Sequence, residues 1–204
     1  MRYTYVIDAG HGGLDMAGKY TTDPKKNKKF TFPDGHTVYE GVINRDIARL
    51  VEAHLKARGV IFVRAYDNVQ DWPLLKRVKV ANDLHGTNKP VIYLSIHSNA
   101  GKGKGFEIFT SPGQTQSDKV ADVFIKTYMK RFPQYPMRSD KVDGDLDKEA
   151  DYTVLTETKC PAVLVENLFF DNLQEADYLQ SESGQSAIAG AIVEAISIIE
   201  RDGI

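Results

Sequence analysis

Short apolar runs alternate along this chain with longer stretches in which apolar residues recur every three or four positions. The short runs are rich in Val, Ile, Phe and Tyr, residue types that favour β-strands. We therefore expect a strand in each of them. The five expected strands are Tyr3–Ile7, Val60–Arg64, Val91–Ile96, Phe106–Thr110 and Ala162–Val165.

The longer stretches have the spacing of amphipathic helices, in which the apolar residues share one face. Gly59 is a natural stop for the first of these helices, and Pro133 ends the third. The pattern from Leu74 to Leu84 is the weakest. The four expected helices are Ile43–Leu55, Leu74–Leu84, Val120–Phe132 and Ile188–Ile199.

This alternation predicts an α/β fold. We expect an open, twisted, largely parallel sheet of five or six strands, with helices on both faces. The chain has 204 residues, 42% of them hydrophobic, which suits one domain with a sizeable core. We expect a single domain over residues 1–204, with no linker to a second domain.

One irregular stretch, Lys19–Thr37, contains several lysines together with prolines and glycine. We expect a long exposed loop or a loose hairpin there. Its lysines, at Lys25–Lys29, are expected to form a solvated face. The alternative is that they attract an anionic polymer by long-range steering.

A second irregular stretch, Gln134–Asp151, is polar and acidic. Asp143, Asp145 and Asp147 have the alternate spacing of a calcium loop, but the glycine that such a loop needs at its sixth position is missing. We therefore expect a solvated loop.

Composition narrows the possible partners. The net charge of −2 lacks the basic footprint of nucleic-acid binding, and no apolar run is long enough to span a membrane. Met1 leads almost directly into the first strand, so we expect no secretory signal peptide. We therefore expect the protein to be made in the cytoplasm. The single cysteine, Cys160, excludes an internal disulfide framework and is expected to be a small buried residue.

Two histidines lie just past the ends of predicted strands. His11 lies among three glycines in Asp8–Gly13, and His97 opens the segment His97–Gly101. Glycine permits tight backbone geometry and the close approach of another group. Because ligands of such sheets bind beyond the carboxyl ends of the strands, we expect these two histidines to share a metal site there.

A catalytic zinc ion takes three protein ligands and leaves one position for water. Glu40 is the best third candidate, since it stands at the start of a predicted helix, where the helix dipole favours a carboxylate. A hydrolytic site also needs a base that takes a proton from water. Glu166 fits that need, because it follows the apolar strand Ala162–Val165 directly.

The remaining polar candidates have ordinary interpretations. His36, His54 and His85 lack a comparable setting. His54 and His85 are expected to be structural, and His36 is expected in the long loop, with a contact to substrate as the minor alternative. Glu107 is expected to be a half-exposed strand residue, with a contact to substrate as the alternative. Asn99 is expected to cap a turn, or else to orient His97 or bind substrate.

Four ordered motifs resemble the zinc-dependent N-acetylmuramoyl-L-alanine amidases of the Amidase_3 type. They are Asp8–Gly13, Glu40 with Asn44, Ser95–Ala100 and Val163–Glu166. Weaker matches at Arg77, Ala81-Asn82 and Gly105–Glu107 extend the likeness over nearly the whole chain.

The resemblance implies a peptidoglycan hydrolase that cuts the amide between N-acetylmuramic acid and L-alanine. It implies His11, Glu40 and His97 as ligands of one Zn²⁺ ion, and Glu166 as the catalytic acid and base. The chain departs from the family at Leu168, where the family usually has glycine, and in the unusual length of Lys19–Thr37.

Other functions remain open at this point. A zinc peptidase or deacetylase would use the same metal chemistry on another amide, and a non-catalytic wall-binding protein could keep the zinc without turnover. The expected setting is that of a monomeric phage endolysin, a bacteriolytic enzyme that is made in the cytoplasm and acts on the cell wall after release. An autolytic bacterial enzyme is the alternative.

Overall fold

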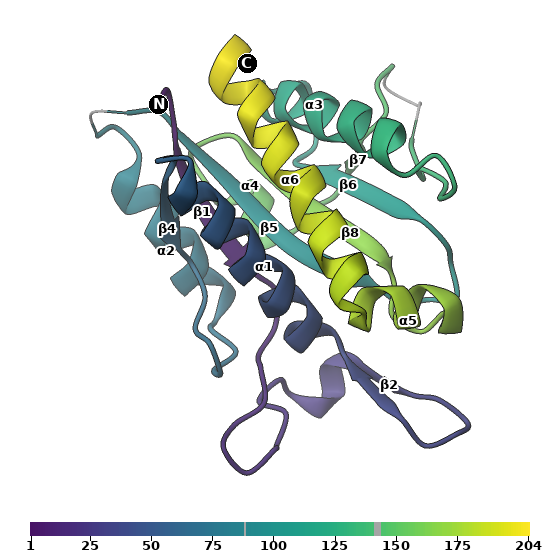
Figure 1. Cartoon of the computed structure of the whole chain (residues 1–204). Coiled ribbons are helices and arrows are strands. Elements are labelled where there is room, and N and C mark those ends of the chain that lie inside the picture. The colour runs from purple at the N-terminus through teal and green to yellow at the C-terminus, as the bar shows by residue number, and fades with distance from the viewer. Residues whose placement is uncertain (88, 141–143) are drawn as a thin grey trace.

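A six-stranded sheet forms the centre of the molecule (Figure 1). The computed structural model describes residues 1–87, 89–140 and 144–204. In spatial order the strands are β4, β1, β5, β8, β6 and β7. Their bounds are β1 Thr4–Ala9, β4 Ile61–Arg64, β5 Val91–Asn99, β6 Phe106–Thr110, β7 Lys148–Glu149 and β8 Ala162–Phe169.

The sheet is largely parallel, as the sequence predicts. Strands β4, β1, β5 and β8 run in the same direction, whereas β6 pairs antiparallel to β8 and carries β7 parallel to itself. The predicted α/β class, with an open sheet of five or six strands, is confirmed.

Helices cover both faces of the sheet, again as expected. On one face α1, α3 and α6 pack together, with α5 beside them, and on the other face α2 packs against α4 (Figure 1). A capping box at Thr115 and Asp118 fixes the start of α3. The helices are α1 Glu40–Ala57, α2 Leu74–Leu84, α3 Gln116–Arg131, α4 Thr153–Thr156, α5 Leu173–Gln180 and α6 Glu182–Asp202.

Alternation along the central strands divides the interior into two cores. In β1, Tyr5 and Ile7 face the large core under α1, α3 and α6, while Val6 faces the smaller core under α2 and α4. Because successive side chains point to opposite faces, Asp8 lies on the side of Val6. The same parity in β5 and β8 brings His97 and Glu166 to this side of the sheet.

The long lysine-rich stretch contains a short hairpin. A 3-10 turn over Pro24–Lys26 precedes β2 (Lys29–Thr31), which pairs antiparallel with β3 (Thr37–Tyr39). This hairpin projects from the lower end of the molecule in Figure 1 and leads directly into α1. Of the two expected forms, the stretch takes the hairpin.

Three strands continue beyond the ends that the sequence predicts, and the first of them, β1, reaches Ala9. Strand β5 continues to Asn99 and β8 continues to Phe169, so that His97 and Glu166 lie within strands rather than just past their ends. Polar residues in these positions remain in the ladder because they line a site instead of facing bulk water. The short elements β7, α4 and α5 were also not predicted, since their apolar patterns are too brief to detect.

The acidic stretch is only partly a solvated loop. Asp143 lies outside the described residues. Asp147 is buried, and its carboxylate accepts a hydrogen bond of 2.6 Å from Oγ1 of Thr110. The prediction of a solvated loop is therefore wrong at Asp147, because this residue packs against the end of β6.

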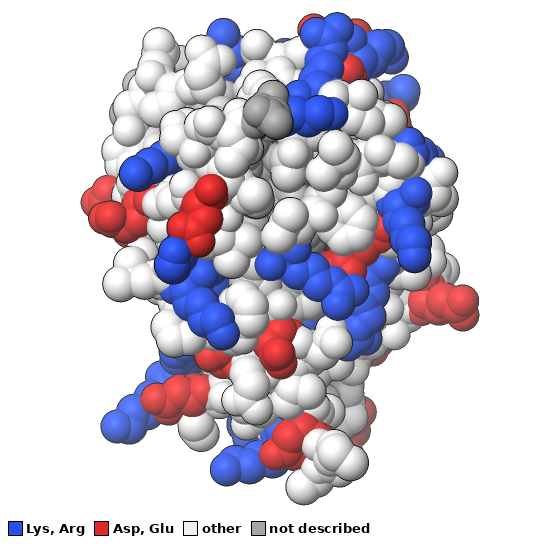
Figure 2. All heavy atoms as spheres, turned by 90° about the vertical axis from the view of Figure 1, so that its left-hand side faces the viewer, with Lys and Arg blue, Asp and Glu red and all other residues white. Residues whose placement is uncertain are grey.

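Three further features are the single cysteine, the surface charges and the lengths of the helices. Cys160 is buried, as expected. Lys and Arg side chains are interspersed with Asp and Glu on the face shown in Figure 2. Within the described part of the chain, every helix is too short or too polar to cross a membrane.

Candidate metal centre and catalytic pocket

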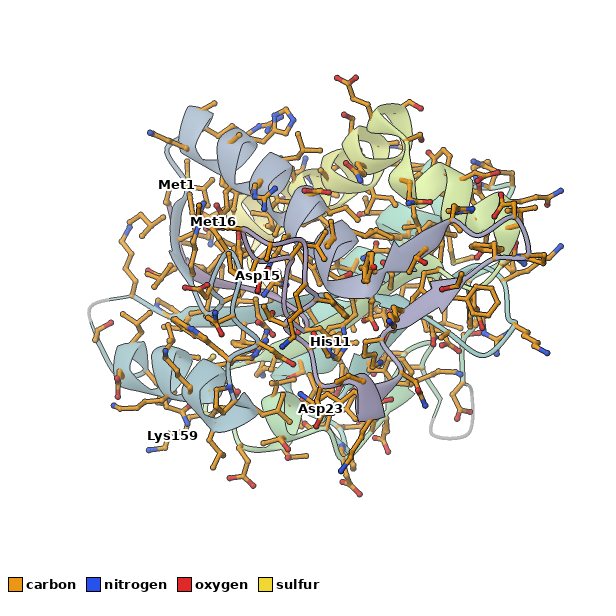
Figure 3. All side chains as sticks on the ribbon, turned by 90° about the horizontal axis from the view of Figure 1, so that it is seen from below. Met1, His11, Asp15, Met16, Asp23 and Lys159 are labelled. Atoms are coloured by element: carbon orange, nitrogen blue, oxygen red, sulfur yellow. The ribbon has the colours of Figure 1, made fainter. Side chains whose placement is uncertain are left out.

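The three predicted ligands converge at one end of the central sheet, the end near the β2–β3 hairpin. His11 follows β1, Glu40 is the first residue of α1, and His97 lies in β5. Oε1 of Glu40 lies 2.9 Å from Nδ1 of His97 and 3.2 Å from Nε2 of His11. All three potential ligand atoms lie within 4.8 Å of one another. In Figure 3, which looks at this end of the molecule, His11 lies near the middle.

Gly10 allows the two histidines to approach. The backbone at Gly10 packs directly against the imidazole of His97, and a Cβ atom at this position would overlap the ring. The centroids of the His11 and His97 rings are 5.0 Å apart, with the rings nearly perpendicular. Residue 10 must therefore be glycine, because a side chain there would clash with His97. This agrees with the expectation that the glycines allow the close approach of another group.

Two buried arginines hold the backbone of His11 in place. His11 adopts a left-handed conformation, with φ of 64°, which is uncommon for a residue with a side chain. Its carbonyl oxygen accepts hydrogen bonds from Arg45, at 2.6 Å, and from Arg77, at 3.0 Å. Arg77 also pairs with the buried Asp8 at 2.5 Å. Tertiary contacts thus determine where the imidazole points.

Glu40 is fully buried but has several polar partners, one of them a positively charged lysine. Nζ of Lys28 lies 3.2 Å from Oε2, and Nδ2 of Asn44 lies 3.4 Å from Oε1. Burial alone would raise the pKa of Glu40, but His11 and His97 more than offset it and hold the pKa well below its ordinary value. The carboxylate is therefore ionised, and the start of α1 stabilises it further.

The donor set fits a zinc ion. In a tetrahedral zinc site the ligand atoms are about 3.3 Å apart, given metal–ligand distances of about 2.0–2.1 Å. The two separations from Glu40 Oε1, at 2.9 and 3.2 Å, are close to this value. Among the described residues, the buried Nε2 of His11 has no partner with hydrogen-bond geometry, although Oε1 of Glu40 lies 3.2 Å away. Burial lowers the pKa of His11 in spite of Glu40, which favours the neutral imidazole that binds metals.

Glu166 lies beside the three candidate ligands. It is paired directly with His97 in the ladder between β5 and β8, so both side chains lie on the same face. Its buried Oε2 accepts no hydrogen bond from the described residues. The pKa of Glu166 is raised to about 7, chiefly by burial; Glu40 also contributes to the rise, while His97 and Lys28 oppose it. A carboxyl group with a pKa near neutrality is suited to act as a general base.

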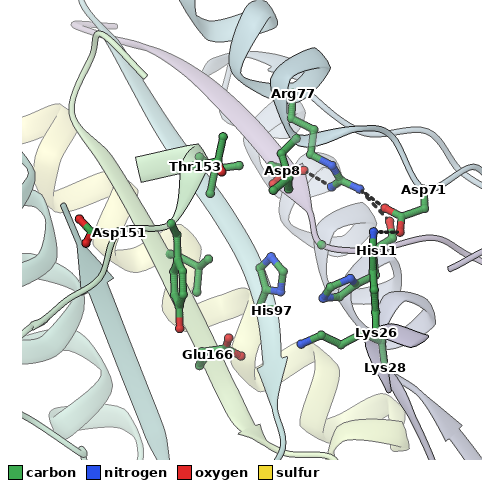
Figure 4. A pocket seen from close by; sticks show the side chains of 15 residues that line it. Asp8, His11, Lys26, Lys28, Asp71, Arg77, His97, Asp151, Thr153 and Glu166 are labelled. Carbon is green, nitrogen blue, oxygen red and sulfur yellow. Dashed lines mark hydrogen bonds and ion pairs between the residues drawn. The ribbon is translucent and has the colours of Figure 1, made fainter. Parts of the chain in front are cut away.

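A pocket of about 380 Å³ opens over this group (Figure 4). His97 lies between Glu166 and His11 in this view, and Arg77 is linked to Asp8 and Asp71. Sequence reasoning missed Tyr152 as part of the wall, because α4 and its approach show no helical pattern. The other residues not singled out beforehand are Asp71, Leu74, Asp151, Thr153, Val154 and Leu164.

Lys28 corrects one expectation. The lysines of the hairpin region were expected to form a solvated face, and Lys25 and Lys29 are indeed exposed. Lys28 instead lines the pocket and forms an ion pair with Glu40. Lys26 pairs with Asp71 at 2.9 Å. The pairing of the hairpin with the start of α1 turns Lys28 inward.

Glu107 is buried, which corrects the expectation of a half-exposed residue. Its carboxylate pairs with Arg138 at 2.8 Å and Lys148 at 2.6 Å, and it lies opposite Glu166 in the β6–β8 ladder. Asn99 caps its turn as expected, since its Oδ1 accepts a hydrogen bond of 2.7 Å from the backbone of Ala100. Asn99 also donates a hydrogen bond to Glu107.

The other histidines lie outside the group. His36 stacks on Phe32 in the hairpin, His54 is in α1, and His85 ends α2. At Leu168, where the resemblance leads us to expect glycine, the chain adopts a left-handed backbone with φ of 60°. The conformation that favours glycine is therefore kept, although the side chain is leucine.

Known proteins resemble the chain throughout. Residues 6–198 match the family described as N-acetylmuramoyl-L-alanine amidase. The endolysin of Bacillus phage SPP1 is 30% identical over 95% of this chain and 64% of its own length. The N-acetylmuramoyl-L-alanine amidase CwlM of Bacillus licheniformis is 28% identical over 90% of this chain and 63% of its own. The chain thus spans less than two thirds of either relative.

A solved structure supports the same fold. The N-acetylmuramoyl-L-alanine amidase AmiC2 of Nostoc punctiforme superimposes with a TM-score of 0.76 at 24% identity. The likeness covers 98% of this chain and 97% of that one. The sheet and its helices are therefore those of a known enzyme fold.

Proposed function

The chain belongs to the N-acetylmuramoyl-L-alanine amidase family, and on that premise we propose that it is a zinc-dependent hydrolase of peptidoglycan. The bond cut is the amide between the lactyl group of N-acetylmuramic acid and L-alanine. One observation carries the proposal: His11, Glu40 and His97 converge from three distant parts of the chain, with the buried Glu166 beside them.

His11, Glu40 and His97 would hold one Zn²⁺ ion. A bound zinc ion lowers the pKa of water and polarises a carbonyl group. With two neutral imidazoles and one carboxylate as ligands, such a centre would keep one net positive charge. Tyr152 and Leu74 form part of the wall of the pocket that His11 and His97 line.

Glu166 moves the proton. It takes a proton from the attacking water as the new C–O bond forms, and it delivers that proton to the alanine nitrogen as the C–N bond breaks. The products are a free amino group on L-alanine and a lactyl carboxylate on the sugar. The pKa near 7 allows Glu166 to act in both directions at neutral pH.

The setting proposed here is bacteriolytic. The endolysin of phage SPP1 and the amidase CwlM suggest that the substrate is the bacterial cell wall. We propose that residues 1–204 act as a single catalytic domain and as a monomer.

Mass spectrometry of digested peptidoglycan tests the reaction directly. We expect stem peptides with a free L-alanine amino group and glycan with intact muramic acid, and we expect a chelator to abolish both products. Release of acetate, or cleavage between amino acids, would instead indicate a deacetylase or a peptidase. Zinc binding without any product would indicate a non-catalytic protein.

Two variants test the assigned roles. Glu166→Gln should keep its zinc and lose roughly 10²–10⁴-fold in rate, the usual contribution of a general base. His97→Ala should lose both zinc and activity. Metal analysis alongside the digestion separates the two effects, and an E166Q enzyme with full activity would refute the role of Glu166.

A further inference from the structure

The hairpin positions Lys28 directly opposite Glu40. The pairs of the β2–β3 ladder end with Lys29 and Tyr39, so Lys28 and Glu40 are the next residues along each strand. The amide of Glu40 donates a hydrogen bond of 3.1 Å to the carbonyl oxygen of Lys28. The backbone of Lys28 is therefore fixed relative to the first residue of α1.

The side chain of Lys28 is fixed as well. Its Nζ lies 3.2 Å from Oε2 of Glu40, the oxygen that does not face the histidines. The side chain is 32% exposed and lines the pocket together with His97 and Glu166. Figure 4 shows the ammonium group in the space between Glu166 and His11.

The ammonium group retains hydrogen-bonding capacity. A lysine ammonium has three N–H donors, and within the described parts of the chain the only carboxylate in ion-pair distance of Lys28 is that of Glu40. Two donors thus remain for a molecule in the pocket. Lys26 differs, because its ammonium pairs with Asp71 away from Glu40.

We propose that Lys28 is a further catalytic residue, which donates a hydrogen bond to the carbonyl oxygen of the scissile amide as negative charge develops on it. This inference rests on the proposed function. Hydrolysis turns that neutral oxygen into an oxyanion before the C–N bond breaks, and a positioned donor in a partly buried pocket stabilises the oxyanion more than the substrate. The hairpin is then part of the active site.

Steady-state kinetics of Lys28→Met, Lys28→Arg and Lys29→Met test the proposal. Loss of one oxyanion donor costs roughly 10²–10³-fold in kcat, so we expect a kcat reduced about 100-fold in K28M with little change in KM. K28R keeps the charge and should recover part of the rate. Lys29 is the matched control, since it is the exposed neighbour in β2, and K29M should match the wild type.

Zinc affinity, measured by competition with a chelator, separates this role from a purely structural one. Lys28 adds positive charge beside Glu40, so K28M should bind zinc as tightly as the wild type or more tightly. If Lys28 only holds Glu40 in place, K28M will bind zinc more weakly and lose activity in proportion. That result would overturn the proposal, as would an unchanged kcat.

A rescue experiment adds a second line of evidence. Methylammonium added to Lys28→Ala should restore part of the lost rate, whereas tetramethylammonium, which has no N–H donor, should not. Equal effects of the two ions would contradict the proposal. If the wild type releases no L-alanine amino group from peptidoglycan, the proposed function itself fails, and the role of Lys28 falls with it; a wild type that is active beside an equally active K28M refutes Lys28 alone.

Discussion

Buried charges determine how the side chains of the site behave. Glu40 is buried but ionised, because two imidazoles and Lys28 surround it. Glu166 is buried with an unpartnered oxygen among the described residues, so its ionised form costs more free energy. Two carboxyl groups in one site thus have pKa values shifted in opposite directions. A carboxylate that binds a metal must be ionised, whereas a carboxyl group that carries a proton needs a pKa near neutrality. The opposite pKa shifts of Glu40 and Glu166 meet these two requirements.

The pH dependence of the reaction should reflect Glu166. Burial raises its pKa to about 7, and a general base works only when it is deprotonated. Activity should therefore fall as the pH falls through the pKa of Glu166, and this acidic limb should lie well above the value of about 4.3 for an ordinary glutamate. A pH profile of kcat/KM measures it. An acidic limb at or below the ordinary value would contradict the assignment.

Leu168 should respond to substitution in an unusual order. Both Leu168→Ala and Leu168→Gly remove buried apolar surface. For the alanine variant this lowers the free energy of unfolding by about 2–5 kcal/mol. At a φ of 60°, however, a left-handed backbone costs about 1–2 kcal/mol for residues other than glycine. We therefore expect the L168G variant to be more stable than L168A by about 1 kcal/mol, as measured by urea unfolding.

Leu94 is the control for this comparison. It is also buried, and its φ is not positive. There the usual order should hold, with the alanine variant more stable than the glycine variant. The same order at both positions would show that the backbone at Leu168 is not strained.

Helix α2 is tied to the end of β1 through Arg77. Its guanidinium group pairs with Asp8 and Asp71 and donates to the carbonyl oxygens of Ala9 and His11. Oγ of Ser95 in β5 donates to the other oxygen of Asp8. One helix and two strands thus meet at a buried ion pair directly behind the candidate metal ligands, and the position of His11 depends on all three.

Arg77→Met should destabilise the protein strongly. It would leave the buried Asp8 carboxylate without its main partner, a change that typically costs about 3–5 kcal/mol. Chemical unfolding would measure the loss, and the double variant with Asp8→Asn should recover part of it. Lys79→Ala, which removes an exposed pair with Asp83 on the same helix, should have little effect. Similar losses in both variants would argue against this role of Arg77.

In the whole molecule, the large hydrophobic core and the candidate site lie on different faces of the central sheet. The large core lies under α1, α3 and α6, and both termini lie at the end opposite the hairpin, where the backbone amide of Arg2 is bonded to Glu200 (Figure 1). The site is on the other face, at the carboxyl ends of β1, β5 and β8. A metal ion held by His11, Glu40 and His97 would connect α1 with the two central strands β1 and β5.

Zinc should therefore stabilise the whole fold. A ligand at 100 times its Kd adds about 2.7 kcal/mol to the free energy of unfolding, because only the native state brings the three ligands together. For a chain of this size, that corresponds to a rise in Tm of about 5–10 °C. Calorimetry of the wild type and His97→Ala, each with and without zinc, measures it. An equal rise in both proteins would indicate binding elsewhere.

Much of this protein follows from local sequence. The apolar runs and the helical spacing determined the α/β class, the five main strands and the four long helices, because hydrophobic periodicity directly reflects which side of an element is buried. The setting of His11, His97, Glu40 and Glu166 was informative for a similar reason. His11 follows β1 and Glu40 begins α1, while His97 and Glu166 lie in the carboxyl-terminal halves of β5 and β8. In these places the backbone geometry restricts which residues are useful.

Only the tertiary structure decided the rest. The inward turn of Lys28, the burial of Glu107 and Asp147, and the wall formed by Tyr152 depend on contacts between segments far apart in the chain. A lysine or a glutamate looks the same in the sequence whether its charge meets water or a partner, because the partner is supplied by the fold. Periodicity therefore located the site, and long-range packing determined its electrostatics.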